Sequence, residues 1–506
     1  MKTKIIFLNS IFYIISNFSF SQNPGDSIFF SPNIHTVKIY FSQANWWDSL
    51  VMYKPIDKKM PGDVEIDGTY INSVGIQFKG NSSFSKDSLK NSFKIDFNEF
   101  VSGQKYDGLK VINLNNGASD PTMMREKIFL DFCLAAGVEA PRATYTNLYI
   151  NDTLWGLYTL IEQVNKTFLQ NEYGNDGGNL FKGDPYGTLE WLGSNPANYY
   201  HSYELKTNET ENDWTDLVHL TDEINNTSSV NLYDSLENVL NTISWIEAWA
   251  ANNIFVNLDS YMGSGHNYYV YHNTATNKFD FIIWDVNGTF GANKHFGMNI
   301  SQLENLSILF IPPSPSIRPL NKRMLQDTTY LNSYINTVCN YVSNYYSNAY
   351  LDPIIDSLAN LIRPYVYADT NKFYTNQQFE DNININVTTG TNVIPGLKSL
   401  ITNRRISLAS QLATYGCLLG VNDISEESIL EIYPNPFSET TTLEITNWQN
   451  QNYDLKIYDV FGKCVYQSKI LNQKSLILNL NLPNGIYFLQ VKGNNFIQTK
   501  KMEVIK

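Results

Sequence analysis

The sequence predicts an α+β protein in which a mixed domain of strands and helices precedes a small all-β sandwich. Three observations lead to this prediction. β-rich segments dominate the first third of the chain, amphipathic helical patterns dominate its middle, and short strands divided by Pro, Asn and Gly fill its end without a helical signal. With 506 residues and a hydrophobic content of 43%, the chain can bury more than one sizeable core.

Charge and cysteine usage exclude several classes of protein. The 36 basic and 49 acidic residues give a net charge of −13, which argues against a general electrostatic hold on nucleic acid or anionic lipid. The cysteines form no CxxC pair and have no metal-site spacing to histidine, so neither a zinc site nor a disulfide framework is indicated. We therefore expect buried free thiols at Cys133, Cys339, Cys417 and Cys464.

Residues 1–22 have the three-part form of a secretory signal peptide. Lys2 and Lys4 precede an apolar core, and the small residues Ser19 and Ser21 follow it. A membrane anchor is the alternative, but polar residues interrupt the apolar run before it is long enough to span a bilayer. We find no other stretch of that length, so we expect a mature protein outside the cytoplasm with no integral membrane segment.

A β meander, a helix and a hairpin are predicted in the first half of the mixed domain. The best helix signal has Asp120 as N-cap, Pro121 at the first position and Gly137 as the stop. Helices are expected at 45–53, 120–137 and 165–173, and period-2 alternation places strands at 36–41, 63–66, 69–78, 92–97, 143–150 and 154–162.

The loop between the strands 69–78 and 92–97 has a composition that suits phosphate binding. It reads KGNSSFSKDSLKN over residues 79–91, and Lys94 stands at the centre of the following strand. Small residues let backbone N–H groups approach a phosphate, and a lysine can reach it as a point charge. The alternative is a solvated hairpin with surface lysines, which the loop by itself favours.

The second half of the mixed domain is predicted to be mainly helical. Residues 174–210 are polar and rich in Asn, which predicts a loop. Apolar residues at helical spacing predict a core helix over residues 232–255, in which we expect Trp245 and Trp249 to pack rather than to bind a ligand. The other helices are expected at 213–225, 320–326, 330–343, 351–366 and 396–414.

The stretch from Asn253 to Gly291 carries the clearest chemical signal. A helix end leads to Asp259 in a Gly-rich turn, and two strands, 268–272 and 279–284, form a hairpin that ends at Asp285. The hairpin brings Asp259, Asn267 and Asp285 to neighbouring strand ends. Two acids and an amide suit a divalent metal and the phosphates that it carries. The same residue types beside Gly are also common turn formers, which would need no chemistry.

The end of the chain resembles the C-terminal type A sorting domain of proteins exported by the type IX secretion system of Bacteroidetes. The resemblance covers residues 428–506, after a linker at 417–427, and its matching segments are YPNPFS (433–438), YDVFGK (458–463) and LPNGIYFLQV (482–491). It implies Sec export, recognition by the type IX machinery, removal of the domain, and release or attachment at the cell surface.

Residues 34–416 resemble the CotH kinase family, which is similar to an atypical protein kinase. The resemblance implies a two-lobe, atypical protein-kinase-like domain that transfers phosphate from ATP with Mg²⁺ or Mn²⁺. The matching segments, in chain order, are IQFKGNSS (76–83), KNSFKIDF (90–97), LNNGASDPTMMREKI (114–128), LYINDTLWGLYTLIEQVNKTFL (148–169), GNLFKG (178–183), NLDSYMGSGHNYYVYHN (257–273) and FIIWDVNGTFG (281–291).

The resemblance also implies a set of nucleotide contacts. Lys94 would hold the α and β phosphates with Glu126 as its partner, and Glu162 would lie near the adenine. Arg125 competes with Glu126 for the inward-facing place on the helix. Further phosphate contacts are assigned to Lys79, Ser82 and Ser83.

The catalytic and metal-binding roles fall on the central stretch. Asp259 would accept or orient the hydroxyl proton of the acceptor, and Asn267 and Asp285 would ligate the metal. His266 is an alternative for the contact assigned to Asn267. The chain departs from the protein-kinase pattern, because it has GNSS in the phosphate loop, no HRD before the acid, and DVNG in place of DFG.

Three functions are compatible with these residues. The first is a secreted, ATP- and metal-dependent phosphotransferase that acts on a Ser or Thr hydroxyl of an exported or surface protein. The second is a non-catalytic surface binding or structural protein on a kinase-like scaffold, against which the presence of Lys94, Asp259 and Asp285 argues. The third is a glycoside hydrolase with Asp259 and Asp285 as its acid pair, which no sugar-cleft context supports.

Overall fold

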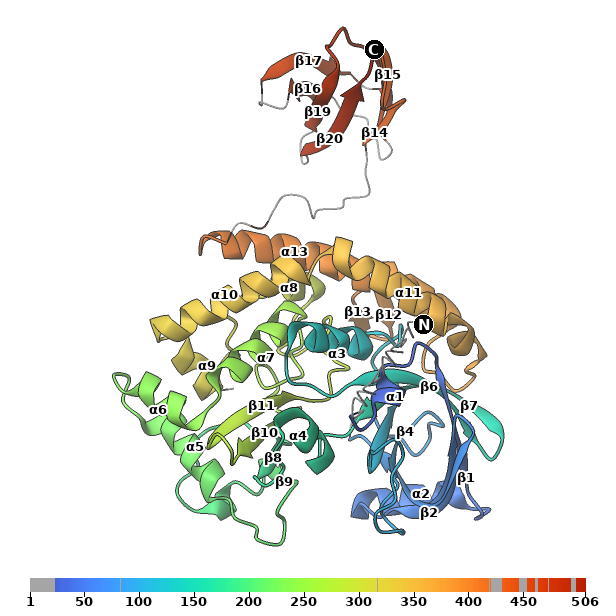
Figure 1. The fold of residues 1–506 in the computed structure, drawn as a ribbon, viewed down its shortest axis with the longest axis vertical. Coiled ribbons are helices and arrows are strands. Elements are labelled where there is room, and N and C mark those ends of the chain that lie inside the picture. Colours follow the sequence, from blue (N-terminus) through green and yellow to red (C-terminus); the bar gives the residue numbers. More distant parts are fainter. Residues whose placement is uncertain are drawn as a thin grey trace, which may run out of the picture. The chain divides into compact units, whose positions relative to one another are not determined.

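The chain forms two compact units, Met1–Gly420 and Val421–Lys506 (Figure 1). The expected signal peptide and most of the expected linker lie outside the described residues. The computed structural model describes residues 23–81, 83–315, 317–417, 419, 430–445, 453–459, 463–471, 473–492 and 497–506.

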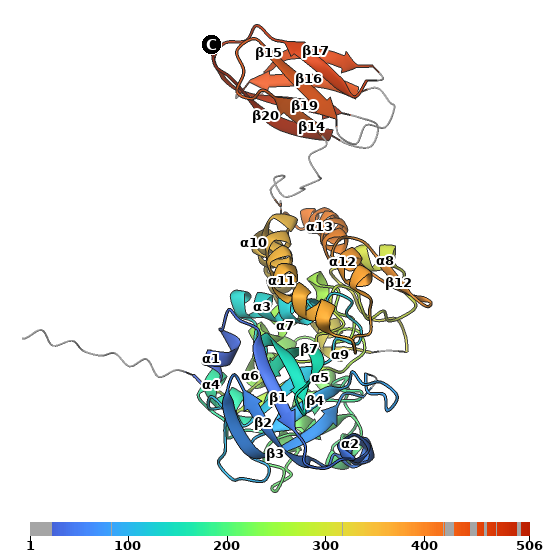
Figure 2. The ribbon, with the colours of Figure 1, turned by 90° about the vertical axis from the view of Figure 1, so that its right-hand side faces the viewer.

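The first unit contains a closed barrel with the strand order β1-β2-β3-β4-β5-β7-β6 (Figure 2). β1 pairs antiparallel with β2 and parallel with β6, and the parallel pair closes the barrel. The strands are β1 (His35–Tyr40), β2 (Met60–Ile66), β3 (Thr69–Lys79), β4 (Ser92–Asp96), β5 (Val111–Asn115), β6 (Ala143–Ile150) and β7 (Thr153–Glu162).

The closure of the barrel and the strand β5 are additions to the predicted architecture. β5 is short, and the asparagines among its outward-facing residues hide its apolar signal. Alternate residues of β3, β4 and β5 fill the barrel interior, including Phe78, Ile95 and Leu114. Because successive side chains point to opposite faces, Lys79, Lys94, Asn113 and Asn115 lie together on the outer face of the barrel.

The helix after β5 starts later than predicted. α3 (Arg125–Ala136) ends at Gly137 as expected, but Asp120 does not cap it directly. The Asp120 carboxylate instead accepts hydrogen bonds from the backbone N–H groups of Thr122 at 2.9 Å and Arg125 at 2.8 Å. Asp120 therefore stabilises a turn that leads into the helix.

The predicted hairpin of the central stretch is confirmed. β10 (Tyr268–Asn273) pairs antiparallel with β11 (Lys278–Ile283). The prediction of a loop at 174–210 is wrong, because this segment contains β8 (Leu180–Gly183) and β9 (Tyr203–Leu205). β8 pairs with the distant β10, so the sheet order is β11-β10-β8-β9, and a short strand of this kind has no local sequence signal.

The predicted single helix over residues 232–255 is also wrong. It consists of α6 (Leu232–Val239) and α7 (Thr242–Ile254), separated at Asn241. The Asn241 side chain caps α7 by accepting a hydrogen bond from Ser244 N, and its own backbone N–H donates to Phe279 O at 2.8 Å. The predicted packing role of the tryptophans is confirmed, because Trp249 stacks on Tyr334 at 3.9 Å.

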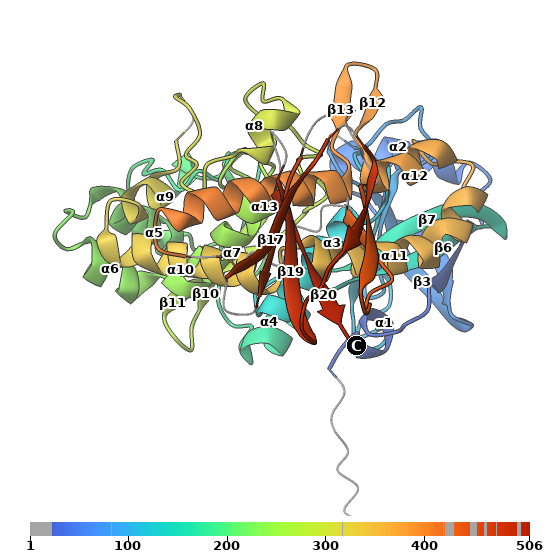
Figure 3. The same ribbon diagram turned by 90° about the horizontal axis from the view of Figure 1, so that it is seen from above.

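α13 packs against both α10 and α11, and these three helices form a layer of the unit (Figure 3). None of the helices in the described part of the chain is both long and apolar enough to cross a membrane. The other elements of the unit are α1 (Asp26–Phe29), α2 (Trp46–Tyr53), α4 (Lys166–Tyr173), α5 (Thr215–Asn226), α8 (Ile300–Glu304), α9 (Pro319–Met324), α10 (Thr328–Asn344), α11 (Asn348–Ala368), α12 (Asn376–Asn384), α13 (Leu397–Ala413) and the hairpin of β12 (Val387–Thr389) and β13 (Asn392–Ile394).

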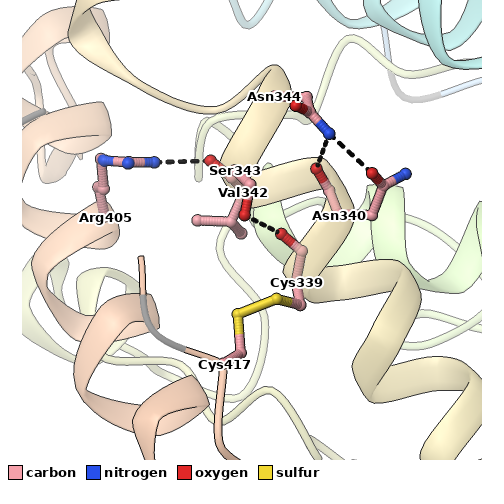
Figure 4. The surroundings of a disulfide bond; sticks show 7 residues. All are labelled: Cys339, Asn340, Val342, Ser343, Asn344, Arg405 and Cys417. Atoms are coloured by element: carbon pink, nitrogen blue, oxygen red, sulfur yellow. Dashed lines mark hydrogen bonds between the residues drawn. A yellow bond between two sulfur atoms is a disulfide. The ribbon is translucent and has the colours of Figure 1, made fainter. Parts of the chain in front are cut away.

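The expectation of four free thiols is wrong for one pair. Cys339 on α10 and Cys417 after α13 form a disulfide with a Cα–Cα distance of 6.2 Å (Figure 4). The two cysteines are 78 residues apart, and the packing of α10 against α13 brings them together. Cys133 is a buried free thiol as expected, whereas Cys464 is free but exposed. A disulfide suits a protein that leaves the cytoplasm.

The second unit confirms the predicted all-β domain. It contains two antiparallel sheets, with strand orders β14-β15-β18 and β17-β16-β19-β20, which share one apolar core. The strands are β14 (Leu430–Tyr433), β15 (Thr440–Ile445), β16 (Tyr453–Asp459), β17 (Cys464–Ile470), β18 (Ser475–Asn479), β19 (Gly485–Lys492) and β20 (Ile497–Val504).

Candidate functional site

A lysine, an amide and a carboxylate form a hydrogen-bonded chain from the barrel to α3. Lys79, the last residue of β3, donates from Nζ to Oδ1 of Asn115 on β5 at 2.7 Å. Nδ2 of Asn115 in turn donates to the two carboxylate oxygens of Glu126 at 2.9 and 3.0 Å. The amide therefore links the ammonium of Lys79 to the carboxylate of Glu126, and each group has a fixed direction.

Asp285 completes this cluster from the end of β11. Burial and the negative charge of Asp285 raise the pKa of Glu126 to about 7, against the effects of Asn115 and Lys79. Burial lowers the pKa of Lys79, and the charges of Asp285 and Glu126 oppose that change. The positive charge of Lys79 therefore acts on two carboxylates, those of Glu126 and Asp285. The charge of Lys182 on β8 also reaches Asp285, but Lys182 is already ion-paired with Asp184.

Asp285 carries two marks of a ligand-binding carboxylate. Its Oδ1 atom is buried and has no hydrogen-bond partner among the described residues. Its backbone lies in the left-handed region at φ 48°, which a non-glycine residue adopts at a cost in free energy. Burial raises the pKa of Asp285 although Lys79 lowers it. An unsatisfied carboxylate oxygen of this kind fits a divalent cation.

Two histidines converge on Asp259. Its Oδ1 lies 3.1 Å from Nε2 of His266 and 3.2 Å from Nε2 of His295. Burial would raise the pKa of Asp259, but the hydrogen bonds and charge of the two histidines hold it well below its usual range. Nδ2 of Asn267 donates to the backbone oxygen of Asp259 at 2.9 Å. The negative charge of Asp259 also raises the pKa of Asp285, so the two acids belong to one site.

Two glycines allow the turns around Asp259 to approach closely. A Cβ atom at Gly263 would lie 2.0 Å from the backbone oxygen of Leu258. A Cβ atom at Gly288, in the DVNG turn, would lie 2.9 Å from Cβ of Asp259. Arg318 holds the first turn by donating to the backbone oxygens of Tyr261 and Gly263.

A second lysine, Lys94 on β4, lies on the same outer face of the barrel as Lys79. Lys94 pairs in register with Gln77, so it lies on the same outer face as Lys79. Burial lowers the pKa of Lys94 to about 8, and the positive charges of Lys206 and Lys59 add to that effect. The structure therefore places Lys79 in direct contact with the Asn115 amide, and Lys94 further along the same face.

The other residues named from the sequence have different surroundings. Glu162 is 2% exposed and accepts two hydrogen bonds from the Arg142 guanidinium, at 2.9 and 2.7 Å, and one from the Arg142 backbone N–H at 3.2 Å, so its carboxylate is already satisfied. Arg125 pairs with Asp120 inside the protein, so Glu126 takes the place toward the site. Ser83 lies in the loop, where its hydroxyl would be 2.4 Å from a Cβ at Gly80. Ser82 lies outside the described residues.

Sequence reasoning missed Asn115, His295 and Arg318. Asn115 lies on a strand that was not predicted, and His295 comes 36 residues after Asp259 in an irregular segment. Arg318 follows a Pro-rich loop that has no resemblance to a functional motif. The segment LNNGASDPTMMREKI contains Asn115, and its match to the family pattern was the one signal available for any of the three.

Comparisons with known proteins identify the family of each unit. The first unit is a mixed α+β unit with a buried cluster of a lysine and carboxylates, and the second is an all-β unit. The family described as CotH kinase protein matches residues 76–408, and the secretion system C-terminal sorting domain matches residues 431–506. The chain belongs to the CotH kinase protein family. Its sorting domain indicates type IX secretion to the cell surface or beyond.

Individual relatives are distant. Inner spore coat protein H of Bacillus subtilis (strain 168) is 26% identical over 226 residues, which are 44% of this chain and 60% of that protein. The chain therefore spans less than two thirds of the length of this relative. The crystal structure of the Helicobacter pylori proinflammatory kinase CtkA matches 69% of this chain and 92% of its own, with 9% identity and a TM-score of 0.24. A TM-score this low does not by itself support a shared fold.

Proposed function

We propose that the first unit is an ATP- and metal-dependent phosphotransferase that acts at the cell surface or outside the cell. It would move the γ-phosphoryl group of ATP to a Ser or Thr hydroxyl of an exported or surface protein. The observation that carries this proposal is the buried, unpartnered carboxylate oxygen of Asp285 beside the chain of Lys79, Asn115 and Glu126. Membership in the CotH kinase protein family supports it.

Lys79 is the lysine best placed to bind phosphate in this proposal. Its Nζ is oriented by Asn115, which is itself held by Glu126, so the ammonium is positioned before any ligand arrives. Lys94 lies on the same barrel face and would supply a second positive charge. The loop after Lys79, with Gly80 and Ser83, would cover the phosphates with backbone N–H groups. Glu162 is left out, because Arg142 satisfies its carboxylate.

Asp285 and Asn267 are the residues that would hold Mg²⁺ or Mn²⁺. Carboxylate and amide oxygens are hard ligands of the kind that these ions prefer. The bound cation would neutralise negative charge on the phosphate oxygens. Asp285 has the unsatisfied oxygen, and its pKa is raised by burial, so a cation would also stabilise its ionised form.

Asp259 would orient the acceptor hydroxyl. His266 and His295 keep its carboxylate ionised, so it can accept a hydrogen bond from the hydroxyl at physiological pH. The acceptor oxygen then bonds to the γ-phosphorus, the bond from that phosphorus to the β–γ bridging oxygen breaks, and the hydroxyl proton passes to Asp259. Phosphoryl transfer depends more on positioning than on a strong base, so Asp259 would contribute mainly by orienting the hydroxyl.

Nucleotide binding and phosphate transfer test the proposal directly. In protein without residues 1–22, we expect ATP to bind with Mg²⁺ or Mn²⁺ and label to pass to protein hydroxyls. Asp285→Asn should lower kcat by about 10²–10³-fold, the typical effect of removing one electrostatic group from such a site. Asp356→Asn, which breaks the exposed ion pair with Lys398, is the control and should leave transfer unchanged.

The proposal fails if the wild type binds no nucleotide with either metal. In that case a non-catalytic surface binding protein becomes the better account of the same fold. Incubation with polysaccharides, followed by a reducing-sugar assay, would detect the glycoside hydrolase activity that the acid pair also suggests.

A further inference from the structure

The loop that follows Lys79 is tied at its far end to a distant part of the chain. Lys90, near the end of the loop, donates from Nζ to Oδ2 of Asp369 at 2.5 Å. Asp369 caps the C-terminal end of α11 and is separated from Lys90 by 279 residues. The Lys90 side chain is 1% exposed and that of Asp369 is 3% exposed, so water does not screen the pair.

Both members of this ion pair are satisfied by further contacts to β7. Lys90 Nζ also donates to Leu157 O at 2.7 Å and lies 3.9 Å from the centroid of the Tyr158 ring. Asp369 Oδ2 also accepts from Leu157 N at 3.0 Å. The backbone at Gly156 has φ 132°, and a Cβ there would lie 2.2 Å from Asp369 Oδ2, so glycine is needed for this approach.

Hydrogen bonds connect the backbone at Lys90 to the rest of the described loop. Asn116 Nδ2 donates to Lys90 O at 2.8 Å and to Ser83 O at 3.4 Å, so it joins the two halves of the loop. The side chain of Asn91 accepts from Ser85 N at 3.0 Å and donates to Ser85 O at 2.8 Å. Lys90 is therefore anchored by Asp369, and the serine-rich part of the loop is built on Lys90 and Asn91.

We propose that Asp369 is a positioning residue for nucleotide binding, which acts by holding Lys90 and thereby fixing loop residues 83–91 in a shape ready for phosphate. This inference rests on the proposed function. It assigns a role in substrate affinity to the C-cap residue of α11, which is not one of the residues proposed to bind the nucleotide, the metal or the acceptor. A preformed loop binds its ligand without a further loss of conformational entropy.

Asp369→Asn in the full chain tests the inference, because it removes the charge with little change in shape. Hydrogen–deuterium exchange without nucleotide should become faster in residues 83–91. The KM for ATP should rise about tenfold, which corresponds to about 1.4 kcal/mol, while kcat stays within about twofold. Lys90→Met should act in the same direction. Asp356→Asn, on the same helix but in an exposed pair, should change neither quantity.

A milder variant keeps the test usable if Asp369→Asn does not fold. Asn371→Ala removes the hydrogen bond from Asn371 Nδ2 to Trp155 O, 2.9 Å long, and should give a smaller change of the same kind. Unchanged exchange in residues 83–91, or a lower melting temperature with an unchanged KM, would overturn the inference. If the wild type binds no nucleotide, the proposed function fails and the affinity role with it, while the exchange data still decide whether Asp369 fixes the loop.

Discussion

Lys79 and Lys90 stand at opposite ends of one loop, and the carboxylates near them differ in how fully they are hydrogen-bonded. Lys90 meets one carboxylate, one backbone oxygen and one aromatic ring, and Asp369 is satisfied in return. Lys79 is linked to Glu126 through Asn115 and is also affected by the charge of Asp285, one oxygen of which has no hydrogen-bond partner among the described residues. The Lys90–Asp369 pair is therefore fully hydrogen-bonded, whereas the Asp285 carboxylate near Lys79 has an oxygen without a hydrogen-bond partner in the described structure.

This difference distinguishes charged groups that stabilise the fold from charged groups that can bind a ligand. A buried ion pair with all its hydrogen bonds gains nothing from a third partner, and breaking it leaves an unpaired buried charge. A buried carboxylate with an open oxygen is costly until a cation or a proton satisfies it. The state of hydrogen bonding, more than the presence of lysine or acid, therefore distinguishes the two ends of the loop.

The largest expected effect comes from breaking the complete pair. Asp369→Ala should lower the free energy of unfolding by about 3–5 kcal/mol, because Lys90 would stay buried without its counter-charge. The double variant Lys90→Met/Asp369→Leu should recover most of this loss. Urea denaturation measures both values. A loss as small as that of the exposed pair in Asp356→Asn would remove the distinction between the two ends of the loop.

The incomplete end should respond in activity rather than in stability. Lys79→Met and Glu126→Gln should each lower kcat/KM for ATP by about 10²-fold. The first removes the ammonium, and the second weakens the hydrogen bonds through Asn115 that orient it. The two reductions in kcat/KM should not be additive, and the double variant should have about the same kcat/KM as the less active of the two single variants. Steady-state kinetics on all four proteins form the cycle. Additive losses would show that Lys79 and Glu126 act independently.

The smallest effect concerns a third carboxylate, Glu139, which is neither paired nor placed at the site. Its Oε2 is buried without a hydrogen-bond partner in the described structure, and burial with nearby acids such as Asp280 raises its pKa to about 9. The folded protein therefore keeps Glu139 protonated at neutral pH, whereas the unfolded chain releases that proton above its ordinary pKa near 4.5.

Stability that depends on Glu139 is thus fully present at low pH and is lost as pH rises from about 4.5 toward 9. Glu139→Gln should raise the free energy of unfolding at pH 8 by about 1–2 kcal/mol and flatten its slope between pH 5 and 8. Thermal or urea unfolding across this range provides the measurement. An unchanged slope would mean that Glu139 is ionised in the folded protein, as Asp285 is proposed to be when it binds a cation.

Local patterns predicted the parts of the fold that depend on neighbouring residues. The hairpin of β10 and β11 followed from alternation across a turn, and it brings Asp259, Asn267 and Asp285 together as expected. Barrel closure, the pairing of β8 with β10, and the disulfide depend on contacts between distant segments. No local pattern encodes such contacts.

The same limit explains the choice between the two lysines of the barrel face. The family resemblance assigned the contact with Glu126 to Lys94, which stands at the centre of a strand, and gave Lys79 only a further phosphate contact. The structure joins Lys79 to Glu126 through Asn115, on a strand that was not predicted. His295 was missed for a similar reason, since an irregular segment returns it to Asp259.

The disulfide has a consequence for the protein after export. Cys417 follows the last helix of the first unit, and its bond to Cys339 fastens that end to α10 (Figure 4). If the sorting domain is removed by cleavage after Cys417, the new carboxyl terminus lies a short way along the chain from this disulfide. The disulfide then keeps the end of α13 from unravelling, so a carboxypeptidase outside the cell could remove only the few residues that follow Cys417.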